Sequence, residues 1–277
     1  MIELLKTILI GIVQGITEWL PVSSTGHMIL LNEFLTLDVS EQFWEMFEVV
    51  IQLGSIFAVV VLYFSRLNPL SGRKTAAERA STWRLWLYVV IAVIPSAVIG
   101  FLFDDWFDEH FYNAYSVAVA LIVYGVAFIV IERLHKNKTY KINDTEGLTC
   151  KTAFLIGLFQ VLAIIPGTSR SGSTIIGAML LGMSRVAAAE FSFFMAIPTM
   201  LGASGLKAVK FVLDGEAAMG GMEWAILAVG CVTAFLVSLF AIKFLLDFVK
   251  RHSFSVFGVY RIILGAAVIA YFTIYGK

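Results

Sequence analysis

The sequence predicts an all-α, polytopic membrane protein, an inverted-topology repeat with about six transmembrane helices plus two re-entrant helical hairpins. Of its 277 residues, 59% are hydrophobic and only 14% are charged, whereas a soluble domain carries about 25% charged residues. The mean hydropathy is +0.87. Two polar segments interrupt the apolar chain, and three apolar stretches follow each of them. These observations together predict the membrane class and the repeat.

Charge and cysteine content exclude other classes of protein. The formal net charge is zero and no long basic block occurs, so no nucleic-acid partner is expected. Cys150 and Cys231 stand far apart, without the spacing of a metal or redox motif. The N-terminus lacks the basic start and cleavage site of a signal peptide, so we expect it in the mature protein.

The first polar segment lies in an apolar helical stretch near the N-terminus. Gln14 and Glu18 are four residues apart, so they share one face of a helix. Pro21 ends this stretch, and a short helix follows at 24–35. Because the pair is too broken for one span, it predicts a re-entrant hairpin over 2–35, with irregular backbone buried in protein or lining a cavity.

Six other stretches are long and apolar enough to cross a membrane, which takes about 20 residues. Their expected ranges are 43–64, 85–103, 112–133, 186–205, 224–246 and 256–275. A second broken pair, 150–165 and 171–182, predicts a second re-entrant hairpin over 150–182. The chain is therefore expected to divide into a first repeat at 1–134, a cytoplasmic linker at 135–149 and an inverted second repeat at 150–277.

Residue matches at fixed shifts support the duplication. A shift of 146 aligns Leu9 with Leu155, Ile10 with Ile156, Gly11 with Gly157, Gln14 with Gln160, Ser23 with Ser169, and Gly26 with Gly172. A shift of 142 aligns Glu48 with Glu190. The polar and glycine matches carry the argument, because apolar matches are common in such a chain.

Loop charges predict the orientation. The basic loops 65–84 and 134–151 should be cytoplasmic by the positive-inside rule, and the acidic loops 104–110 and 206–223 should be outside. Equivalent loops of the two repeats then face opposite sides, as in transporters that bind substrate near the midplane. The hairpins should enter from opposite sides and meet at their tips, with both termini external.

The second polar segment has the composition of a phosphate site. Glycine lets backbone approach an oxyanion, and a helix expected from about residue 171 turns its positive end toward the segment. Arg170 supplies a planar, charged fork for phosphate oxygens. With Arg170, we expect these residues to bind phosphate: Gly167, Thr168, Ser169, Ser171, Gly172, Ser173 and Thr174. The structural alternative is a helix-packing segment rich in Ser and Gly.

The first segment supplies an acid, a hydroxyl and an imidazole. Ser24 and His27 lie one helical turn apart, so His27 can activate Ser24 as nucleophile or protonate a leaving oxygen. Attack by His27 itself or by metal-bound water stays open. Glu18 can hold Mg2+ or Ca2+ across a pyrophosphate, with Gln14 as a neutral oxygen ligand. Capping of the following helix is the structural alternative for Ser23.

Charged residues within apolar stretches need a partner or a wet cavity. We expect Arg185, Glu190 and Arg261 to form interhelical ion pairs. The other three histidines, His110, His135 and His252, are expected in loops, so a two-histidine phosphatase site is excluded.

The two polar segments resemble the bacterial undecaprenyl-pyrophosphate phosphatase family, the bacitracin-resistance type. The similar residues are Glu18, the run Leu20-Pro-Val-Ser-Ser-Thr-Gly-His27, the run Pro166-Gly-Thr-Ser-Arg-Ser-Gly-Ser-Thr174, the segment Phe47 to Gly54, and Ser184-Arg185 through Glu190.

The resemblance implies a bacterial inner-membrane enzyme that removes the terminal phosphate of C55-isoprenyl pyrophosphate on the periplasmic side and needs a divalent metal. The monophosphate product carries cell-wall precursors. The resemblance also implies catalytic roles for Glu18, Ser24, His27 and Arg170. Many members have Glu where this chain has Gln14, which leaves Glu18 as the better metal ligand.

Two other functions fit parts of the pattern. A polyprenyl-phosphate or solute transporter can use inverted repeats and broken helices around the same midplane site. A structural scaffold is the third option, but it gives no reason for Arg170 and His27 at helix breaks. The oligomeric state is open, with a homodimer as one option.

Overall fold

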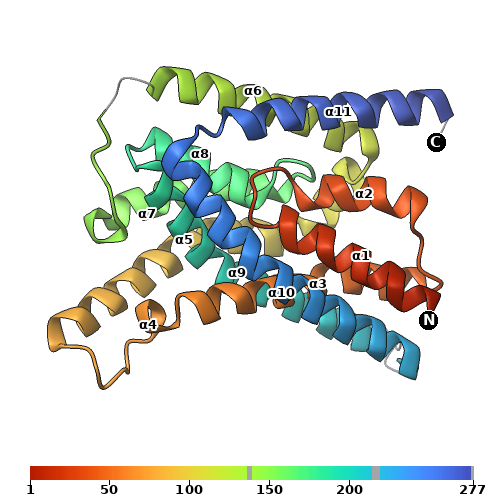
Figure 1. The fold of residues 1–277 in the computed structure, drawn as a ribbon, viewed down its shortest axis with the longest axis horizontal. Helices are drawn as coiled ribbons and strands as arrows, with labels where there is room; N and C mark the ends of the chain where they lie inside the picture. Colours follow the sequence, from red (N-terminus) through yellow and green to blue (C-terminus); the bar gives the residue numbers. More distant parts are fainter. Residues whose placement is uncertain (136–138, 214–218, 276–277) are drawn as a thin grey trace.

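The computed structural model describes residues 1–135, 139–213 and 219–275, without the side chains of residues 104, 105 and 108. Within these ranges the chain is helical and forms no strand (Figure 1). The α-helices are α1 (Ile2–Thr17), α2 (Ser24–Phe34), α3 (Glu41–Leu62), α4 (Phe64–Leu67), α5 (Ala76–Phe111), α6 (Ala114–His135), α7 (Cys150–Val161), α8 (Arg170–Leu180), α9 (Arg185–Leu213), α10 (Gly221–Arg251) and α11 (Ser255–Tyr275). Two 3-10 turns, η1 (Thr145–Gly147) and η2 (Leu162–Ile164), complete the described elements.

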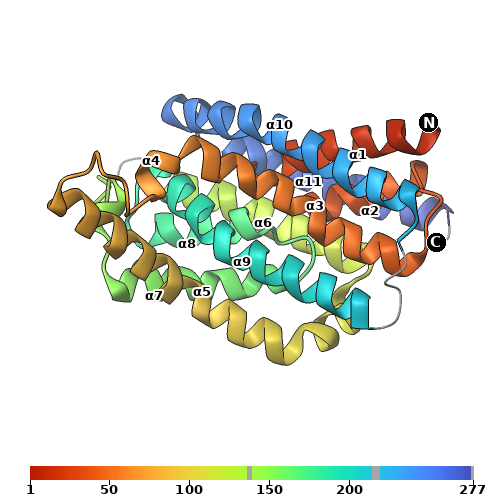
Figure 2. The ribbon, with the colours of Figure 1, turned by 90° about the horizontal axis from the view of Figure 1, so that it is seen from below.

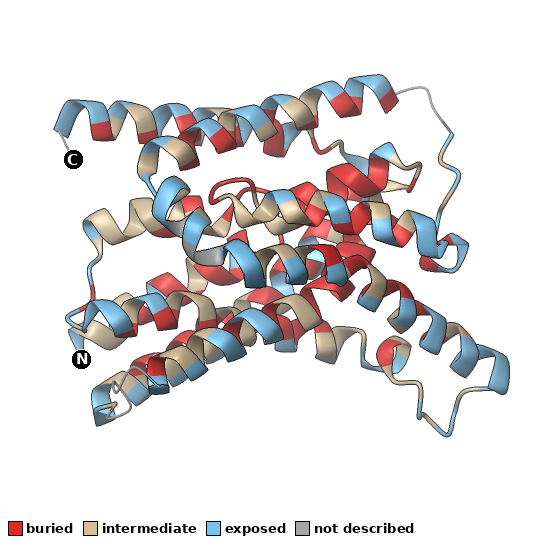
Figure 3. Cartoon of the chain, turned by 180° about the vertical axis from the view of Figure 1, so that it is seen from behind, coloured by how far each residue is buried: buried red, intermediate tan, exposed pale blue. Residues whose placement is uncertain are grey.

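Six helices, α3, α5, α6, α9, α10 and α11, are long and apolar enough to cross a membrane. Their outward faces carry large apolar side chains such as Phe101, Phe240 and Ile263, which are 79%, 75% and 63% exposed. Figure 3 shows the buried residues gathered where the helices cross at the centre, with exposed residues along the outer faces. The predicted class, an all-α polytopic membrane protein, is confirmed.

Two predicted acidic loops are largely helical. Helix α5 continues through 104–110 and ends at Phe111. Helix α6 begins at Ala114, directly after Asn113, whose Oδ1 accepts the N–H of Ser116. In the loop predicted at 206–223, α9 continues to Leu213 and α10 begins at Gly221. Charged residues are tolerated at helix ends. The loops predicted from their acidic residues are therefore shorter in the structure than expected. The described residues do not include Lys136 and Lys138 of the predicted linker. They also do not include Asp214 and Glu216 of the loop predicted at 206–223.

Helices α1 and α2 form one short hairpin, and α7, η2 and α8 form the other. The two hairpins enter from opposite ends of the molecule (Figure 1). Their tips meet, because Ser171 Oγ donates a hydrogen bond to the Glu18 carbonyl at 3.3 Å. Both termini lie at one end, whereas the α4–α5 connection lies at the other (Figures 1 and 2).

The hairpin tips repeat one local geometry. Ser23 and Ser169, the described non-glycine residues with positive φ, have φ of 71° and 72°. Each caps the helix that follows, since its Oγ accepts the N–H three residues on, from Gly26 at 3.3 Å and from Gly172 at 3.2 Å. Packing repeats as well, because α1 lies on α10 while α7 lies on α5. These equivalences support the duplication, and the repeat boundaries stay a prediction.

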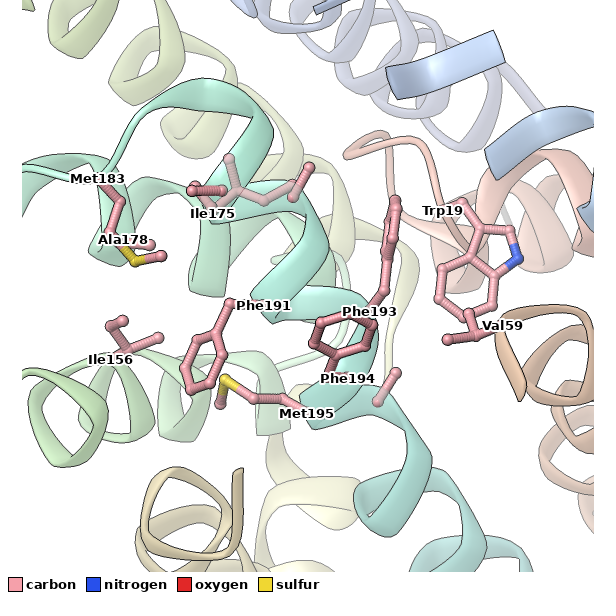
Figure 4. Close-up of a cluster of buried hydrophobic side chains, with 14 of the residues drawn as sticks. Trp19, Val59, Ile156, Ile175, Ala178, Met183, Phe191, Phe193, Phe194 and Met195 are labelled. Carbon is pink, nitrogen blue, oxygen red and sulfur yellow. The ribbon is translucent and has the colours of Figure 1, made fainter. Parts of the chain in front are cut away.

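The buried core fixes the first hairpin tip against α3 and α9. Trp19 is fully buried, and its ring meets Phe193 edge-on at 5.1 Å. Figure 4 shows Trp19 beside Phe193 and Val59. Burying such an aromatic side chain stabilises a fold by roughly 2–3 kcal/mol. The residue next to Glu18 in sequence is therefore held rigidly, which orients the carboxylate.

Candidate active site

The polar tips of the two hairpins meet in a buried ion pair. Arg170 Nη2 lies 3.2 Å from Glu18 Oε1, and the two side chains are only 10% and 5% exposed. Arg170 is the first residue of α8, and Glu18 is the residue that follows α1. The hairpins therefore bring together two residues that are 152 positions apart in sequence.

Three side chains donate hydrogen bonds to the carboxylate of Glu18. Its Oε2 accepts hydrogen bonds from Gln14 Nε2 at 2.9 Å and from Ser24 Oγ at 3.1 Å, while Oε1 faces Arg170. A buried carboxylate requires such partners, because desolvation of an unpaired charge is very costly. Of the four residues predicted as catalytic, Glu18, Ser24 and Arg170 thus form one cluster, with Gln14 beside them.

His27 bonds neither Glu18 nor Ser24 and has its partners outside this cluster. Its Nδ1 lies 2.7 Å from the carbonyl oxygen of Ser23, so this nitrogen donates. In the neutral ring, Nε2 then accepts from the hydroxyl of Tyr260 on α11, which is 2.6 Å away. The two rings are stacked. Both ring nitrogens are engaged elsewhere, so Glu18, not His27, accepts the hydrogen bond of Ser24.

The predicted phosphate segment uses most of its hydroxyls to hold its own shape. Thr168 Oγ1 donates to the carbonyls of Leu162 and Ile165, and Thr174 bonds Ser192 Oγ at 2.7 Å. Ser169 caps α8 and Ser171 donates to the Glu18 carbonyl. The groups left to face a ligand are the guanidinium of Arg170 and the first-turn N–H groups of α8 other than that of Gly172, which Ser169 caps. The buried Ser173 Oγ also has no hydrogen-bond partner among the described residues.

Arg170 has spare hydrogen-bonding capacity. Its Nη1 donates to the Ser192 carbonyl at 2.9 Å, while its buried Nε has no hydrogen-bond partner among the described residues. Its guanidinium carbon lies 5.9 Å from the centre of the Trp19 ring. A buried donor without a partner costs free energy, which a bound oxyanion can recover.

Arg261, for which an ion pair was expected, instead clamps backbone. This fully buried side chain on α11 donates to the carbonyls of Pro21, Gly167 and Thr168 at 3.2, 2.7 and 2.9 Å. The ion-pair prediction was wrong here, because helix breaks leave carbonyls unpaired and a guanidinium has five donors to offer them. One side chain thereby holds both hairpin tips, a role that the mid-span arginine alone did not indicate.

The other expected ion pairs are confirmed. Arg185 binds the carboxylate of Glu132 through both Nε and Nη2, and Arg66 Nη1 lies 2.7 Å from Glu190 Oε2. His135 corrects another expectation, since it is the last residue of α6 and only 8% exposed. Its Nδ1 lies 2.9 Å from the carbonyl oxygen of Ile131, one helical turn earlier.

The oxygen donors near Glu18 fit a weak divalent-cation site. No cluster of three or more His, Cys, Asp or Glu side chains occurs in the described ranges. Glu18 is the acidic residue of the cluster. Gln14 turns its amide nitrogen toward Glu18, so it would offer its neutral amide oxygen to a cation there after a flip of the amide. Mg2+ commonly takes one or two carboxylates together with substrate phosphates and waters. The donor set therefore suits a cation completed by a pyrophosphate.

A carboxylate, a hydroxyl and an arginine joined at the tips of two half-length hairpins inside six spans define a polytopic membrane protein with a buried polar centre. Residues 7–267 match the family described as bacitracin resistance protein BacA. The chain belongs to this family, which confirms the resemblance noted in the sequence.

Curated relatives align along almost the whole chain. The undecaprenyl-diphosphatase of Streptococcus thermophilus is 59% identical over 270 residues, covering 98% of this chain and 93% of that protein. The undecaprenyl-diphosphatase of Enterococcus faecalis is 56% identical over 269 residues, covering 97% of each. A third, from Streptococcus pyogenes, is 57% identical over 270 residues, with 98% and 96% covered.

Proposed function

We propose that this protein is an integral-membrane phosphatase that hydrolyses undecaprenyl diphosphate to the monophosphate and phosphate. The reaction recycles the lipid carrier of cell-wall synthesis. The observation that carries the proposal is the convergence of Ser24 and Arg170 on Glu18 between the hairpin tips. The names of relatives more than half identical to this chain support the substrate.

Arg170 and the N-terminus of α8 bind the terminal phosphate. The guanidinium supplies a fixed positive fork, and the first-turn N–H groups add the positive end of the helix dipole. Arg170 can turn its free Nε and part of its fork to the phosphate while the Ser192 carbonyl holds it in place. Binding is thereby directed to the equatorial oxygens of the transferred phosphoryl group, over which its charge is spread in the transition state.

Ser24 attacks the terminal phosphorus. Its Oγ–H already points at Glu18 Oε2, so the carboxylate takes the proton as the Oγ–P bond forms and the bridging P–O bond breaks. Undecaprenyl phosphate leaves as an anion. Water then attacks the phosphorus of the phosphoserine and the Oγ–P bond breaks. Glu18 returns its proton to Ser24 Oγ, and both protons of the water stay on the released phosphate, which leaves as dihydrogen phosphate.

His27 has a positioning role in this mechanism. It lies one helical turn from Ser24, and its hydrogen bonds to Ser23 and Tyr260 tie the start of α2 to α11. Ser24 is the first residue of α2, so the direction of its hydroxyl depends on that helix start.

Glu18 and Gln14 would hold the Mg2+ or Ca2+ that we propose as cofactor. Such a cation offsets the negative charge of the pyrophosphate. We further propose that the protein lies in the bacterial cytoplasmic membrane with both termini and the reaction on the external side. The placement of both termini at one end, opposite the basic 65–84 loop, supports this orientation.

Purified protein in detergent, incubated with undecaprenyl diphosphate and Mg2+, tests the proposal. We expect stoichiometric release of phosphate and formation of the monophosphate, with loss of both in Glu18→Ala. The transporter alternative predicts no phosphate release by purified protein and movement of the lipid between leaflets in vesicles. Absence of hydrolysis with intact folding would decide for that alternative.

A further inference from the structure

A second polar cavity lies away from the hairpin tips, at the end of the molecule opposite the termini. Its volume is about 170 Å³. It is formed where α4 and the start of α5 meet η1, and its charged lining residues are Arg66, Lys74, Glu78, Arg84 and Glu146. The proposed phosphatase reaction uses none of these side chains.

The cations of this cavity are better placed for a ligand than its carboxylates. Lys74 Nζ is held by two neutral oxygens, the Arg66 carbonyl at 3.1 Å and Thr82 Oγ1 at 2.7 Å. Glu78 caps α5 by accepting from the N–H and hydroxyl of Thr75, and Glu146 accepts from Ser81. Lys74 is half-buried, and Arg84 is exposed at the rim.

The charge of the surrounding segment has the same sign. Residues 66–84 contain five basic side chains and one acidic one. A half-buried ammonium whose partners are neutral attracts an anion, because partial burial weakens screening by solvent. A phosphate group offers several strong acceptor oxygens to such a pair of cations.

A second, apolar cavity is lined by residues of the same two helices, α4 and α5. Its volume is about 360 Å³, and its lining includes Phe64 and Leu67 of α4 and Trp86 of α5. Trp86 Nε1 donates to the Leu67 carbonyl at 2.8 Å, so the hydrogen-bonding group of the indole is already satisfied. This second cavity therefore offers apolar surface to a ligand. It lies near the cationic cavity in the chain, because the consecutive residues Arg66 and Leu67 line one cavity each.

We propose that the two cavities together bind one anionic phospholipid, with its phosphate head group between Lys74 and Arg84 and an acyl chain beside Trp86. The polar cavity alone suits any phosphate, but the apolar cavity near it selects an amphiphile. The site is separate from Glu18 and Arg170, and the inference holds whether or not the protein is a phosphatase.

Native mass spectrometry of the full chain tests the proposal by counting lipids retained from micelles doped with phosphatidylglycerol or phosphatidylcholine of equal chain length. We expect preferential retention of phosphatidylglycerol. Because a basic residue near anionic lipid contributes about fivefold in binding, Lys74→Gln and Arg84→Gln should each weaken retention about fivefold. Arg84→Gln changes an exposed side chain, so folding should be preserved.

A control variant, Lys250→Gln with Arg251→Gln, removes two exposed cations at the end of α10, outside the cavity. It should leave the preference unchanged. Equal retention of the two lipids, or equal losses in the control and the cavity variants, would overturn the proposal. Displacement of the lipid by millimolar inorganic phosphate alone would assign the polar cavity to the free ion and also overturn it.

Discussion

The guanidinium of Arg261 lies 2.7 Å from the carbonyl oxygen of Gly167, so the last membrane helix holds the backbone of the second hairpin. The same side chain holds Pro21 in the first hairpin. The polar tips therefore depend on a residue that need not contact substrate.

Arg261→Leu should destabilise the protein by about 3 kcal/mol or more, because it leaves three carbonyls of the hairpin tips without their donor. Arg261→Lys should lose less, since an ammonium keeps part of the hydrogen bonding. Thermal unfolding in detergent, followed by circular dichroism, measures the effect. Arg251→Leu, at an exposed position, is the control. Equal unfolding temperatures for wild type and Arg261→Leu would contradict the clamp.

Arg170→Ala should reduce phosphate release about 10²–10³-fold, the usual effect of removing an electrostatic clamp. Arg170→Lys should recover part of the activity, because it keeps the charge but not the planar fork. The lysine variant also keeps a cation beside the buried Glu18, which separates a catalytic loss from a folding loss. Near-normal phosphate release by Arg170→Ala would contradict the proposed role of Arg170 in binding the terminal phosphate.

Ser24→Ala should lower kcat by about 10³-fold or more if Ser24 is the nucleophile. Rapid acid quenching of the wild type should trap a phosphoserine that is missing in the variant. Thr25→Ala alters the next residue of the same helix and serves as the control. Full activity of Ser24→Ala would move the attack to His27 or to water.

Gln14→Glu should increase the affinity for divalent cations. The new carboxylate would replace an amide that donates to Glu18 at 2.9 Å, and two adjacent carboxylates favour a bound cation. Titration calorimetry with Mg2+ and the metal dependence of phosphate release both measure the change. Gln160→Glu makes the same substitution at the equivalent position of the other hairpin, where Gln160 bonds Ser96 and Thr199. A similar gain there would argue against a cation site at Glu18.

Gly157→Ala should destabilise the packing of α7 on α5 by about 1–3 kcal/mol. A Cβ at Gly157 would overlap the backbone carbonyl of Ala92, which has no flexible end to move away. Gly100→Ala is the control, because a Cβ there meets open space. Unfolding temperatures should fall for the first variant and stay level or rise for the second. Equal behaviour would show that the close approach is not required.

The sequence predicted the parts of this protein that follow from local patterns. Apolar length located the six spans, and helix breaks at Pro21 and Gly167 located the hairpins. The inverted arrangement then predicted that the hairpin tips meet, and Glu18 and Arg170 are in contact there. Ser23 and Ser169, which match in sequence at the shift of 146, also share one backbone conformation.

Partner choice between distant helices was less predictable. Sequence spacing suggested that His27 would activate Ser24. In the structure, Nε2 of His27 instead bonds the hydroxyl of Tyr260, which is 233 residues away in sequence. Arg261 was expected to find an acid and found carbonyls instead. Periodicity gives the face on which a side chain lies, but not which group of a neighbouring helix stands at the same depth. Such contacts need the three-dimensional arrangement.

Ser24 and Arg170 are the first residues of α2 and α8, and each directly follows the capping serine of its hairpin. The duplicated backbone thus offers the same position twice, facing the same carboxylate from two directions. One copy has acquired a hydroxyl there and the other a guanidinium. A single ancestral turn could in this way diversify into an attacking group and a charge-binding group by side-chain replacement, with no new backbone geometry to evolve.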